Sequence, residues 1–294
     1  MRKVLLCGDI NSVHLRKIVE GLKTSNFELM LFSLAQPSDN WHVQQGMKCF
    51  FPSGSEAPKD FNSSDLQKLS YLKAIKKLRQ IIRETKPDIV HAHYATSYGL
   101  LAVLSGHSNI YTSVWGSDIL DFPDRSFLHK QMIRFVLKRS QRIFATSLVL
   151  KDKVRSLSGR EAELIPYGVN VGLFTPSKTT DKNEVIIGTV KSLEKVYGID
   201  ILLKAFALLM DRKPKKPVRL MIVGKGSCEM EYKDLSRQLG IEKYVDFIGR
   251  VQQEKVPEYL NRFDIFANLS RNESFGVSVL EAMACECPVV VTDV

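Results

Sequence analysis

Short apolar runs alternate with longer amphipathic segments along the whole chain. The short runs are rich in Val, Ile, Leu and Phe, as buried strands are, and the longer segments repeat apolar residues at helical spacing. This alternation predicts an α/β protein with parallel sheets covered by helices on both faces. In the first part of the chain it predicts strands over 3–6, 28–34, 89–92, 110–114, 142–146 and 162–165, and helices over 14–23, 65–85, 97–105, 127–140 and 148–157.

The regular pattern is interrupted over residues 166–182, which contain Pro, Gly, Ser, Thr and charge without periodicity, as a linker does. We therefore expect two doubly wound domains, at 1–172 and 184–294, with a linker at 173–183. Because a six-stranded doubly wound sheet needs more chain, we expect the second domain to be incomplete and the sequence to be truncated. In this second part the pattern predicts strands over 185–190, 219–223, 244–248, 265–268 and 288–292, and helices over 198–210, 228–239, 254–262 and 275–284.

The charge of the chain is unevenly distributed. Its 294 residues have a formal net charge of +10, from 42 Lys and Arg against 32 Asp and Glu. Residues 1–180 contain 25 basic and 15 acidic residues, so residues 181–294 contain 17 of each and are neutral. Such an excess favours an anionic partner. Nucleic acid is excluded, because the basic clusters have no interleaved aromatic residues and no known recognition motif.

Membrane-spanning and secreted classes are not indicated. No apolar run approaches the roughly 18 to 20 residues that span a bilayer, and the apolar stretch at the start is too short for a signal peptide. The five cysteines are odd in number and scattered, which indicates a reduced protein. We therefore expect a cytoplasmic location.

A polar loop followed by a helix, at residues 271–284, carries the most informative chemistry. The free amides of a helix starting near Phe275 form an anion site, and Gly276 lets a phosphate approach the backbone. Glu273 precedes this helix and Glu281 lies about two turns into it, which separates the carboxylates by roughly 10 Å, the size of a nucleotide sugar. The alternative is that Glu273 only complements the helix dipole and that Glu281 is solvated.

These residues resemble retaining glycosyltransferases of the family-four type. The resemblance implies the GT-B fold, in which two Rossmann-like domains face a cleft, and a nucleoside diphosphate sugar as co-substrate. It covers nearly the whole chain. The motifs that carry it are Glu273, seven residues and Glu281, then Ala-Met-Ala and Pro-Val-Val, together with 165–170, Phe174, 222–226 and 245–250.

The resemblance also implies roles for residues of the second domain. Glu273 is expected to face the donor sugar and diphosphate, and Glu281 to bind the ribose. The remaining donor-binding candidates of this domain, for the phosphates or the base, are Ser274, Phe275, Gly276, Val277, Gly249 and Arg250.

Two lysines are candidates for neutralising the diphosphate as it leaves. The family has an Arg and a Lys in the loop after the first strand of this domain, and here the loop contains Lys191 and Lys195 at altered spacing. Two fixed cations would stabilise a transition state in which charge develops on phosphate. The alternative is that both lysines are solvated.

In the first domain, polar residues follow the predicted strands at the edge where α/β proteins bind ligands. Gly8 and Asn11 follow the first strand and are expected to face the donor. His93 is the catalytic candidate of the His-Ala-His-Tyr segment, with a structural histidine as the alternative. His91 and His93 are expected to point to opposite faces, so that they do not share a metal.

The loop after the next strand departs from the family pattern. Trp115 stands where many family members have a His near the transferred sugar, which leaves Asp118 as the polar candidate of this loop. A front-face reaction through an oxocarbenium-like transition state, as the family implies, needs no separate protein base.

Metal and nicotinamide chemistry are not indicated. The sequence contains no Asp-x-Asp motif, so we expect no metal and no other cofactor. The Gly-Lys-Gly segment at 224–226 lacks the third glycine and the acidic partner of a dinucleotide fingerprint.

Two predicted amphipathic helices carry much of the basic excess. Their charged faces would suit an anionic membrane surface and an acceptor carried on a lipid diphosphate, and a solvated face is the alternative. The basic residues are Lys68, Lys73, Lys76, Lys77, Arg79 and Arg83 in one cluster, and Lys130, Arg134, Lys138, Arg139 and Arg142 in the other.

Together these features predict a retaining glycosyltransferase. It would move a sugar from a nucleoside diphosphate sugar, UDP-linked, to a glycan or lipid-linked acceptor in surface polysaccharide biosynthesis, at the inner face of the cell membrane. The alternatives are a nucleotide-sugar 2-epimerase of the same fold and a non-catalytic fragment.

Overall fold

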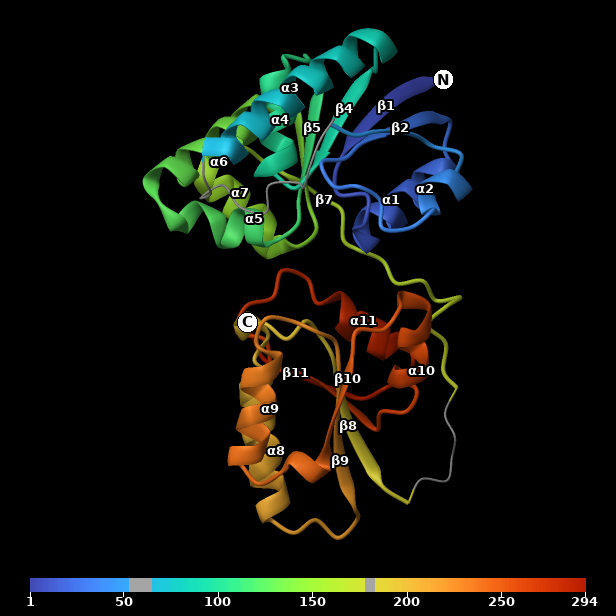
Figure 1. Cartoon of the computed structure of the whole chain (residues 1–294), viewed down its shortest axis with the longest axis vertical. Helices are drawn as coiled ribbons and strands as arrows, with labels where there is room; N and C mark the ends of the chain where they lie inside the picture. Colours follow the sequence, from blue (N-terminus) through green and yellow to red (C-terminus); the bar gives the residue numbers. More distant parts are fainter. Residues whose placement is uncertain (53–64, 178–182) are drawn as a thin grey trace. The chain divides into compact units, whose positions relative to one another are not determined.

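The chain forms two compact units, Met1–Pro166 and Tyr167–Val294, which we describe separately (Figure 1). The computed structural model describes residues 1–52, 65–177 and 183–294, without the side chains of 65–72. Each unit is a parallel sheet covered by helices, as the alternating pattern predicts.

The N-terminal unit contains a seven-stranded sheet in the order β3-β2-β1-β4-β5-β6-β7, and its strand pairs are parallel. The carboxyl ends of its strands therefore lie at one edge, where the loops after β1, β4 and β5 place the polar candidates. The strands are β1 (Arg2–Cys7), β2 (Phe27–Phe32), β3 (Lys48–Phe50), β4 (Ile89–His93), β5 (Ile110–Val114), β6 (Arg142–Ala145) and β7 (Glu163–Leu164).

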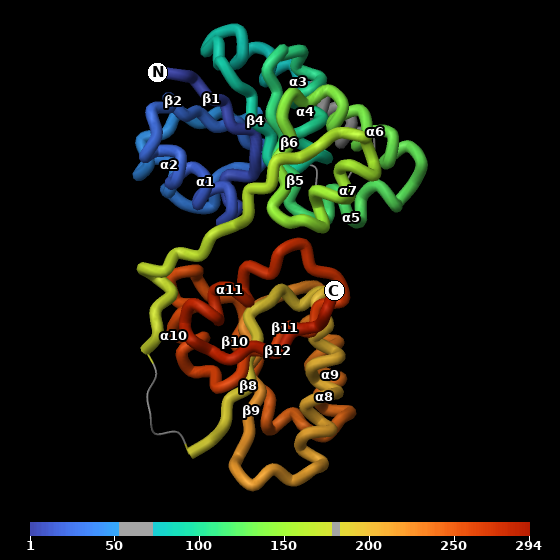
Figure 2. Tube along the Cα trace, turned by 180° about the vertical axis from the view of Figure 1, so that it is seen from behind, coloured from blue at the N-terminus to red at the C-terminus, as the bar shows by residue number. Residues whose placement is uncertain are grey.

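Helices cover both faces of this sheet. Leu15 and Val19 of α1 pack on Val4 and Leu6 of β1, whereas α3 and α4 pack on the face that includes Leu5. Figure 2 gives the reverse view, in which α1 and α2 lie beside β1 and β2. The helices are α1 (Val13–Lys23), α2 (Trp41–Gln44), α3 (Asp65–Thr85), α4 (Ser97–Ser105), α5 (Ser117–Leu120), α6 (Phe127–Arg139) and α7 (Leu148–Ser158), with the 3-10 turn η1 (Phe122–Arg125).

The C-terminal unit contains a five-stranded parallel sheet in the order β10-β9-β8-β11-β12. This is the order of a Rossmann-like sheet, in which the chain reverses direction of growth beside the first strand. The strands are β8 (Val185–Val190), β9 (Val218–Val223), β10 (Val245–Gly249), β11 (Ile265–Asn268) and β12 (Val289–Val291).

Two pairs of helices cover this second sheet. Figure 1 shows α8 and α9 side by side on one face and α10 and α11 on the other, and the apolar side chains divide accordingly: Leu220 and Ile222 face the first pair, Met221 and Val223 the second. The helices are α8 (Ile199–Asp211), α9 (Glu229–Gln238), α10 (Val256–Leu260) and α11 (Val277–Ala284), with the 3-10 turns η2 (Lys195–Tyr197), η3 (Glu242–Tyr244) and η4 (Gln253–Lys255).

The division between the units differs from the expected one. The first unit ends at Pro166, six residues before the expected boundary at 172. The physical reason is packing, because Val169 and the buried Phe174 belong to the apolar cluster of the C-terminal unit. Of the expected linker, residues 178–182 lie outside the described residues.

Within the described residues, no helix combines the length and the apolar character that a membrane span requires.

Candidate functional site

Three loops meet at the carboxyl edge of the C-terminal sheet. They follow β8, β9 and β11, and since β8 lies between the other two strands, its loop at 191–198 is flanked by the loops at 224–228 and 269–276. This edge is where open α/β sheets bind ligands.

Glycines allow these loops to contact one another through their backbones. A Cβ atom on Gly224 would lie 1.8 Å from the carbonyl oxygen of Lys191, and one on Gly198 would lie 1.9 Å from that of Leu269. Both glycines also have positive φ angles, +143° and +64°, which favour glycine. The loop at 191–198 is therefore held between its two neighbours by close backbone contacts.

Glu273 and Lys191 form an ion pair at this edge. The Nζ atom of Lys191 donates to Oε2 of Glu273, and the two side chains are only 10% and 19% exposed. Asn268 Nδ2 and Ser270 Oγ also donate to Oε2, each at 3.3 Å. Burial by itself raises the pKa of Glu273, but the charge and hydrogen bonds of Lys191, Asn268 and Ser270 outweigh it, so that the pKa lies below its ordinary value.

Tyr197 completes the surroundings of the Lys191 cation. The Nζ atom lies 4.8 Å from the centre of the Tyr197 ring, within the range of a cation–π contact. The lysine is thus fixed between a carboxylate and an aromatic face, and an incoming anion would meet a cation of defined position.

The N-terminus of α11 lies next to this pair in the chain. Gly276 is its N-cap residue, with a φ of +78°, and the helix begins at Val277. The amides of a first helical turn have no partners within the helix and bear partial positive charge, which makes such an end an anion site. This edge thus combines a fixed cation with backbone donors.

Glu281, one of the two spaced carboxylates, is buried rather than solvated. Its residue is 5% exposed, and its Oε1 atom accepts a hydrogen bond of 2.8 Å from Nε2 of Gln253, in η4. The carboxylate is therefore held in position from a neighbouring loop.

The other candidates of this unit are less enclosed. Lys195 lies in η2 with a side chain 77% exposed and its Nζ atom 3.9 Å from Glu231, so the structure does not bring it to the Lys191–Glu273 pair. Phe275 packs edge to face against Tyr167, with ring centres 5.7 Å apart. Of the other donor-binding candidates, Ser274 lies on the 269–276 loop and is partly buried. Gly249 ends β10, where its carbonyl oxygen accepts the amide of Gly224 at 2.9 Å, and Arg250 follows it with an exposed side chain.

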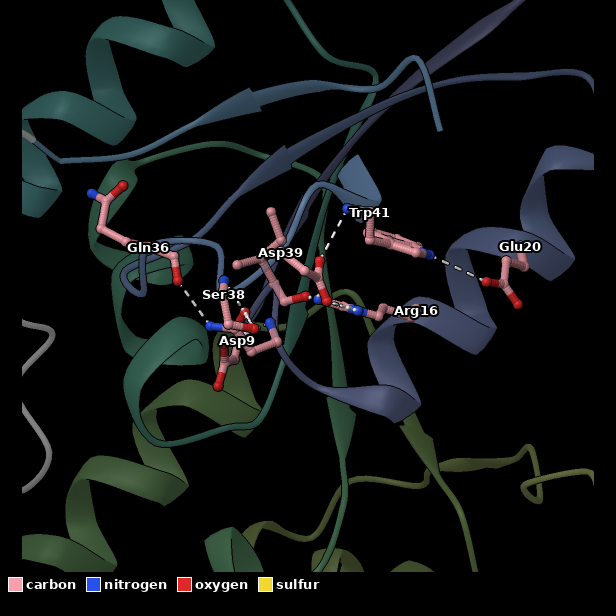
Figure 3. Close-up of polar contacts among 9 residues, drawn as sticks. Asp9, Arg16, Glu20, Gln36, Ser38, Asp39 and Trp41 are labelled. Carbon is pink, nitrogen blue, oxygen red and sulfur yellow. Dashed lines mark hydrogen bonds and ion pairs between the residues drawn. The ribbon is translucent and has the colours of Figure 1, made fainter. Parts of the chain in front are cut away.

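In the N-terminal unit, Asn11 binds the loop that contains Gln36 and Ser38, both of which are labelled in Figure 3. Its Oδ1 atom accepts hydrogen bonds of 2.8 Å from the amide and hydroxyl of Ser38, and its Nδ2 atom donates to the carbonyl of Gln36 at 2.9 Å. Nearby, Arg16 pairs with Asp39 and continues this network of loop contacts. Asn11 therefore fixes the loop after β2 against the loop after β1.

His93 is buried beside Gly8. A Cβ atom on Gly8 would lie 3.3 Å from the Cβ of His93, and within the described residues neither ring nitrogen of His93 has a hydrogen-bond partner. Burial, with the neighbouring His91, lowers the pKa of His93 well below its ordinary value, so its imidazole is neutral at pH 7. A neutral imidazole both donates and accepts hydrogen bonds.

The expectation that His91 and His93 point to opposite faces is wrong. Their ring centres are 4.2 Å apart, because residues two apart in a strand lie on the same face. His91 instead hydrogen-bonds Ser113 at 2.8 Å, and burial lowers its pKa to about 4. Across the described parts of the chain, no group of three or more His, Cys, Asp or Glu side chains is arranged to hold a metal.

Asp118 organises the loops after β4 and β5. Its fully buried carboxylate accepts hydrogen bonds from the amides of Ala95, Trp115 and Gly116 at 2.8, 3.1 and 2.9 Å. Burial raises its pKa above the ordinary value although these hydrogen bonds act in the opposite direction. The carboxylate is thus engaged in backbone contacts.

The structure adds residues that the motifs did not single out. Asn268 and Ser270 contact Glu273, and Tyr197 contacts Lys191. The sequence held a signal for them: Asn268 ends β11, Ser270 follows it, and Tyr197 lies in the loop after β8, and residues at the carboxyl ends of parallel strands face the ligand edge.

Two family models match the chain. Residues 3–147 match the family described as Glycosyl transferase 4-like, and residues 174–294 match Glycosyl transferases group 1. Together the two matches cover most of the chain, which thus belongs to the glycosyltransferases of these two descriptions, and the family-four-like resemblance and the GT-B fold class predicted from its motifs are confirmed.

Curated relatives are similar at moderate identity. The chain is 27% identical over 233 residues to N-acetyl-alpha-D-glucosaminyl L-malate synthase of Bacillus anthracis, a match that covers 74% of this chain and 60% of that protein. It is 25% identical over 268 residues to the putative teichuronic acid biosynthesis glycosyltransferase TuaC of Bacillus subtilis, covering 86% and 65%. The chain thus spans less than two thirds of either relative.

Solved structures share the fold. A sucrose-phosphate synthase from Thermosynechococcus elongatus superimposes with a TM-score of 0.80 at 17% identity, covering 100% of this chain and 82% of that one. Anabaena HepE in complex with UDP gives a TM-score of 0.77 at 19% identity, covering 100% and 81%.

Proposed function

We propose that this chain is a retaining glycosyltransferase that takes a sugar from a UDP-linked donor, and that its C-terminal unit binds the donor. The observation that carries the proposal is the Lys191–Glu273 pair beside the N-terminus of α11. A cation and backbone amides match a diphosphate, and a carboxylate matches sugar hydroxyls. The choice of UDP is supported by Anabaena HepE and by Staphylococcus aureus TarM, both of which have structures in complex with UDP.

In this proposal Lys191 and Glu273 have different roles in the transfer. Lys191 shifts from Glu273 toward the diphosphate as negative charge develops there, which stabilises the transition state more than the bound donor. Glu273 then faces the sugar, and the carboxylate of Glu281 accepts hydrogen bonds from the ribose hydroxyls. Because Lys191 and the α11 amides supply positive charge, the reaction needs no metal ion or other cofactor, and a front-face route needs no separate base.

The acceptor in this proposal is a glycan or a lipid-linked saccharide of surface polysaccharide biosynthesis. The similarity to TuaC supports this class. The N-terminal unit would bind the acceptor at its carboxyl edge, where neutral His93, packed closely against Gly8, offers hydrogen bonds to hydroxyl groups.

We also propose that the chain acts in the cytoplasm at an anionic membrane. Residues 121–160 contain ten basic and three acidic residues, net +7. Phe127 and Leu128 in the first turn of α6 are exposed, as are Leu148 and Val149 in the first turn of α7. Basic charge with exposed apolar residues favours anionic lipid. Sedimentation with phosphatidylglycerol vesicles tests this, and equal binding to phosphatidylcholine vesicles would contradict it.

Calorimetric titration with UDP and UDP-sugars tests the donor site. We expect the wild type to bind UDP and Lys191→Met to bind it about tenfold more weakly, since a fixed cation is lost. Lys243→Met, on an exposed side chain of η3, is the matched control and should bind as the wild type does. Absence of binding by the wild type to every UDP- and GDP-sugar would overturn the proposal.

Product analysis separates transfer from epimerisation. Incubation with the donor alone should leave the sugar configuration unchanged, and conversion of the donor to its 2-epimer would identify the second enzyme class instead.

A further inference from the structure

Arg271, two residues before Glu273, joins the two loops that carry the Lys191–Glu273 pair. Its Nη1 and Nη2 atoms donate to Oδ1 and Oδ2 of Asp200 at 2.8 and 2.6 Å, and Nη1 also donates to the carbonyl oxygen of Lys195 at 2.6 Å. Its backbone amide donates to the carbonyl of Val196 at 2.8 Å. One residue of the 269–276 loop thus makes four hydrogen bonds to residues 195–200.

The partner carboxylate is itself well placed. Asp200 lies in the first turn of α8, where the helix dipole favours a negative charge. The hydrogen bonds from Arg271 are the largest cause of the lowered pKa of Asp200, so this carboxylate is ionised at neutral pH. Because the Arg271–Asp200 pair is partly exposed, Coulomb attraction alone contributes little. The pair fixes the loops through the geometry of its two parallel hydrogen bonds.

Three contacts therefore hold the loops together. The first is the two-pronged Arg271–Asp200 contact, which we call the fork, and the second is the Lys191–Glu273 pair. The third is the close approach of Gly198 to the Leu269 carbonyl. The Lys191 pair is the contact that a bound diphosphate would compete for. The fork uses no group of the Lys191–Glu273 pair and would persist when a ligand binds.

We propose that Arg271 is a positioning residue, which keeps Lys191 and the N-terminus of α11 at the spacing that a diphosphate requires while the Lys191–Glu273 contact opens. This inference rests on the proposed donor site. It assigns Arg271 an effect on the phosphates of the ligand and none on the base.

Titration with UDP and with uridine tests this assignment. Arg271→Gln should weaken UDP binding about tenfold and leave uridine binding unchanged. Arg219→Gln is the matched control, because Arg219 forms a similar two-pronged pair with Asp246, at 3.0 and 2.6 Å, between β9 and β10. It should lower stability without changing either affinity. UDP affinity within twofold of the wild type, or equal weakening of UDP and uridine, would overturn the proposal.

A ligand-free measurement separates this inference from the donor assignment. Hydrogen exchange of the amides over 192–198 should become at least several-fold faster in Arg271→Gln and remain unchanged in Arg219→Gln. Arg271→Lys keeps the positive charge but not the two-pronged contact, so its exchange should be about as fast as that of Arg271→Gln. If the wild type binds no nucleotide, the donor assignment fails, and hydrogen exchange alone tests whether Arg271 positions the loop. Unchanged exchange in Arg271→Gln would show that it does not.

Discussion

The two parts of the chain differ in their net charge and in the ionisation of the side chains at the carboxyl edge of each sheet. Residues 1–180 carry the whole net charge of +10, yet the polar groups at the edge of the N-terminal sheet, His93 and Asp118, are buried and their pKa values are shifted toward the neutral forms. Residues 181–294 have no net charge, yet Lys191 and Glu273 are paired and the pKa of Glu273 is lowered. Burial without a counter-charge favours the neutral form, whereas burial beside one preserves ionisation. Net charge therefore does not locate the charged chemistry of this molecule.

The largest expected effect comes from a substitution that breaks the Lys191–Glu273 ion pair. Glu273→Gln should lower transfer from a UDP-sugar by about 100-fold or more, because an interaction with the reacting sugar is lost. UDP affinity should be kept, since Lys191 is released for phosphate. Measuring UDP release and UDP binding checks both parts. The exposed Glu254→Gln serves as control, and Glu273→Gln activity above one tenth of wild type would contradict the prediction.

The next effect concerns the buried carboxylate of the other unit. Asp118→Ala should destabilise the N-terminal unit by about 3 kcal/mol, because two buried amides and one partly buried amide lose their acceptor. Both tryptophans, Trp41 and Trp115, lie in this unit, so urea unfolding followed by tryptophan fluorescence reports on it selectively. The exposed Asp121→Asn should change stability little, and an equally small effect of Asp118→Ala would show that the carboxylate is not structural.

A smaller effect follows from the lowered pKa of Glu273. A carboxylate with a folded-state pKa below its unfolded value stabilises the fold above the unfolded pKa and loses that contribution as pH falls through the folded pKa. We expect the wild type to exceed Glu273→Gln in stability by about 1 kcal/mol at pH 7. This difference should narrow below the ordinary pKa of 4.5. Urea unfolding followed by circular dichroism measures it, and a difference that is constant with pH would exclude the linkage.

The smallest expected effect compares the two lysines of one loop. Lys195→Met should change UDP affinity by less than about threefold, against the tenfold expected for Lys191→Met, because the Lys195 side chain is 77% exposed and lies beside Glu231. Calorimetric titration of both variants with UDP measures the two affinities. Equal losses would mean that Lys195 also reaches the ligand.

Much of the fold follows from the hydrophobic pattern, because long parallel strands and their covering helices repeat apolar residues at fixed spacing. The elements that the pattern missed are short: α2 and α5 have four residues each and β3 has three. Elements of this length contain barely one helical turn or strand repeat, too little for a periodic signal, and their position depends on tertiary contacts such as the pairing of β3 with β2.

The site was predictable as far as local sequence determines it. Glu273, Gly276 and Lys191 occupy loop positions that chain order alone places at one sheet edge. Sequence could not distinguish Lys191 from Lys195, because the choice depends on which way a loop turns, and that is set by its contacts with Leu269 and Gly224. The histidine error was avoidable, since two-residue periodicity already places His91 and His93 on one face.

The glycines that let the three loops touch also determine how this site can change. At Gly198 and Gly224 a single added methyl group would overlap a backbone carbonyl, so the course of the loops cannot vary without moving the sheet edge itself. Diversity in ligand choice would have to come from the side chains of these loops, such as Tyr197, and of the neighbouring segment after β10, such as Arg250. A mutant library designed to alter donor preference should therefore vary those positions and leave the glycines untouched.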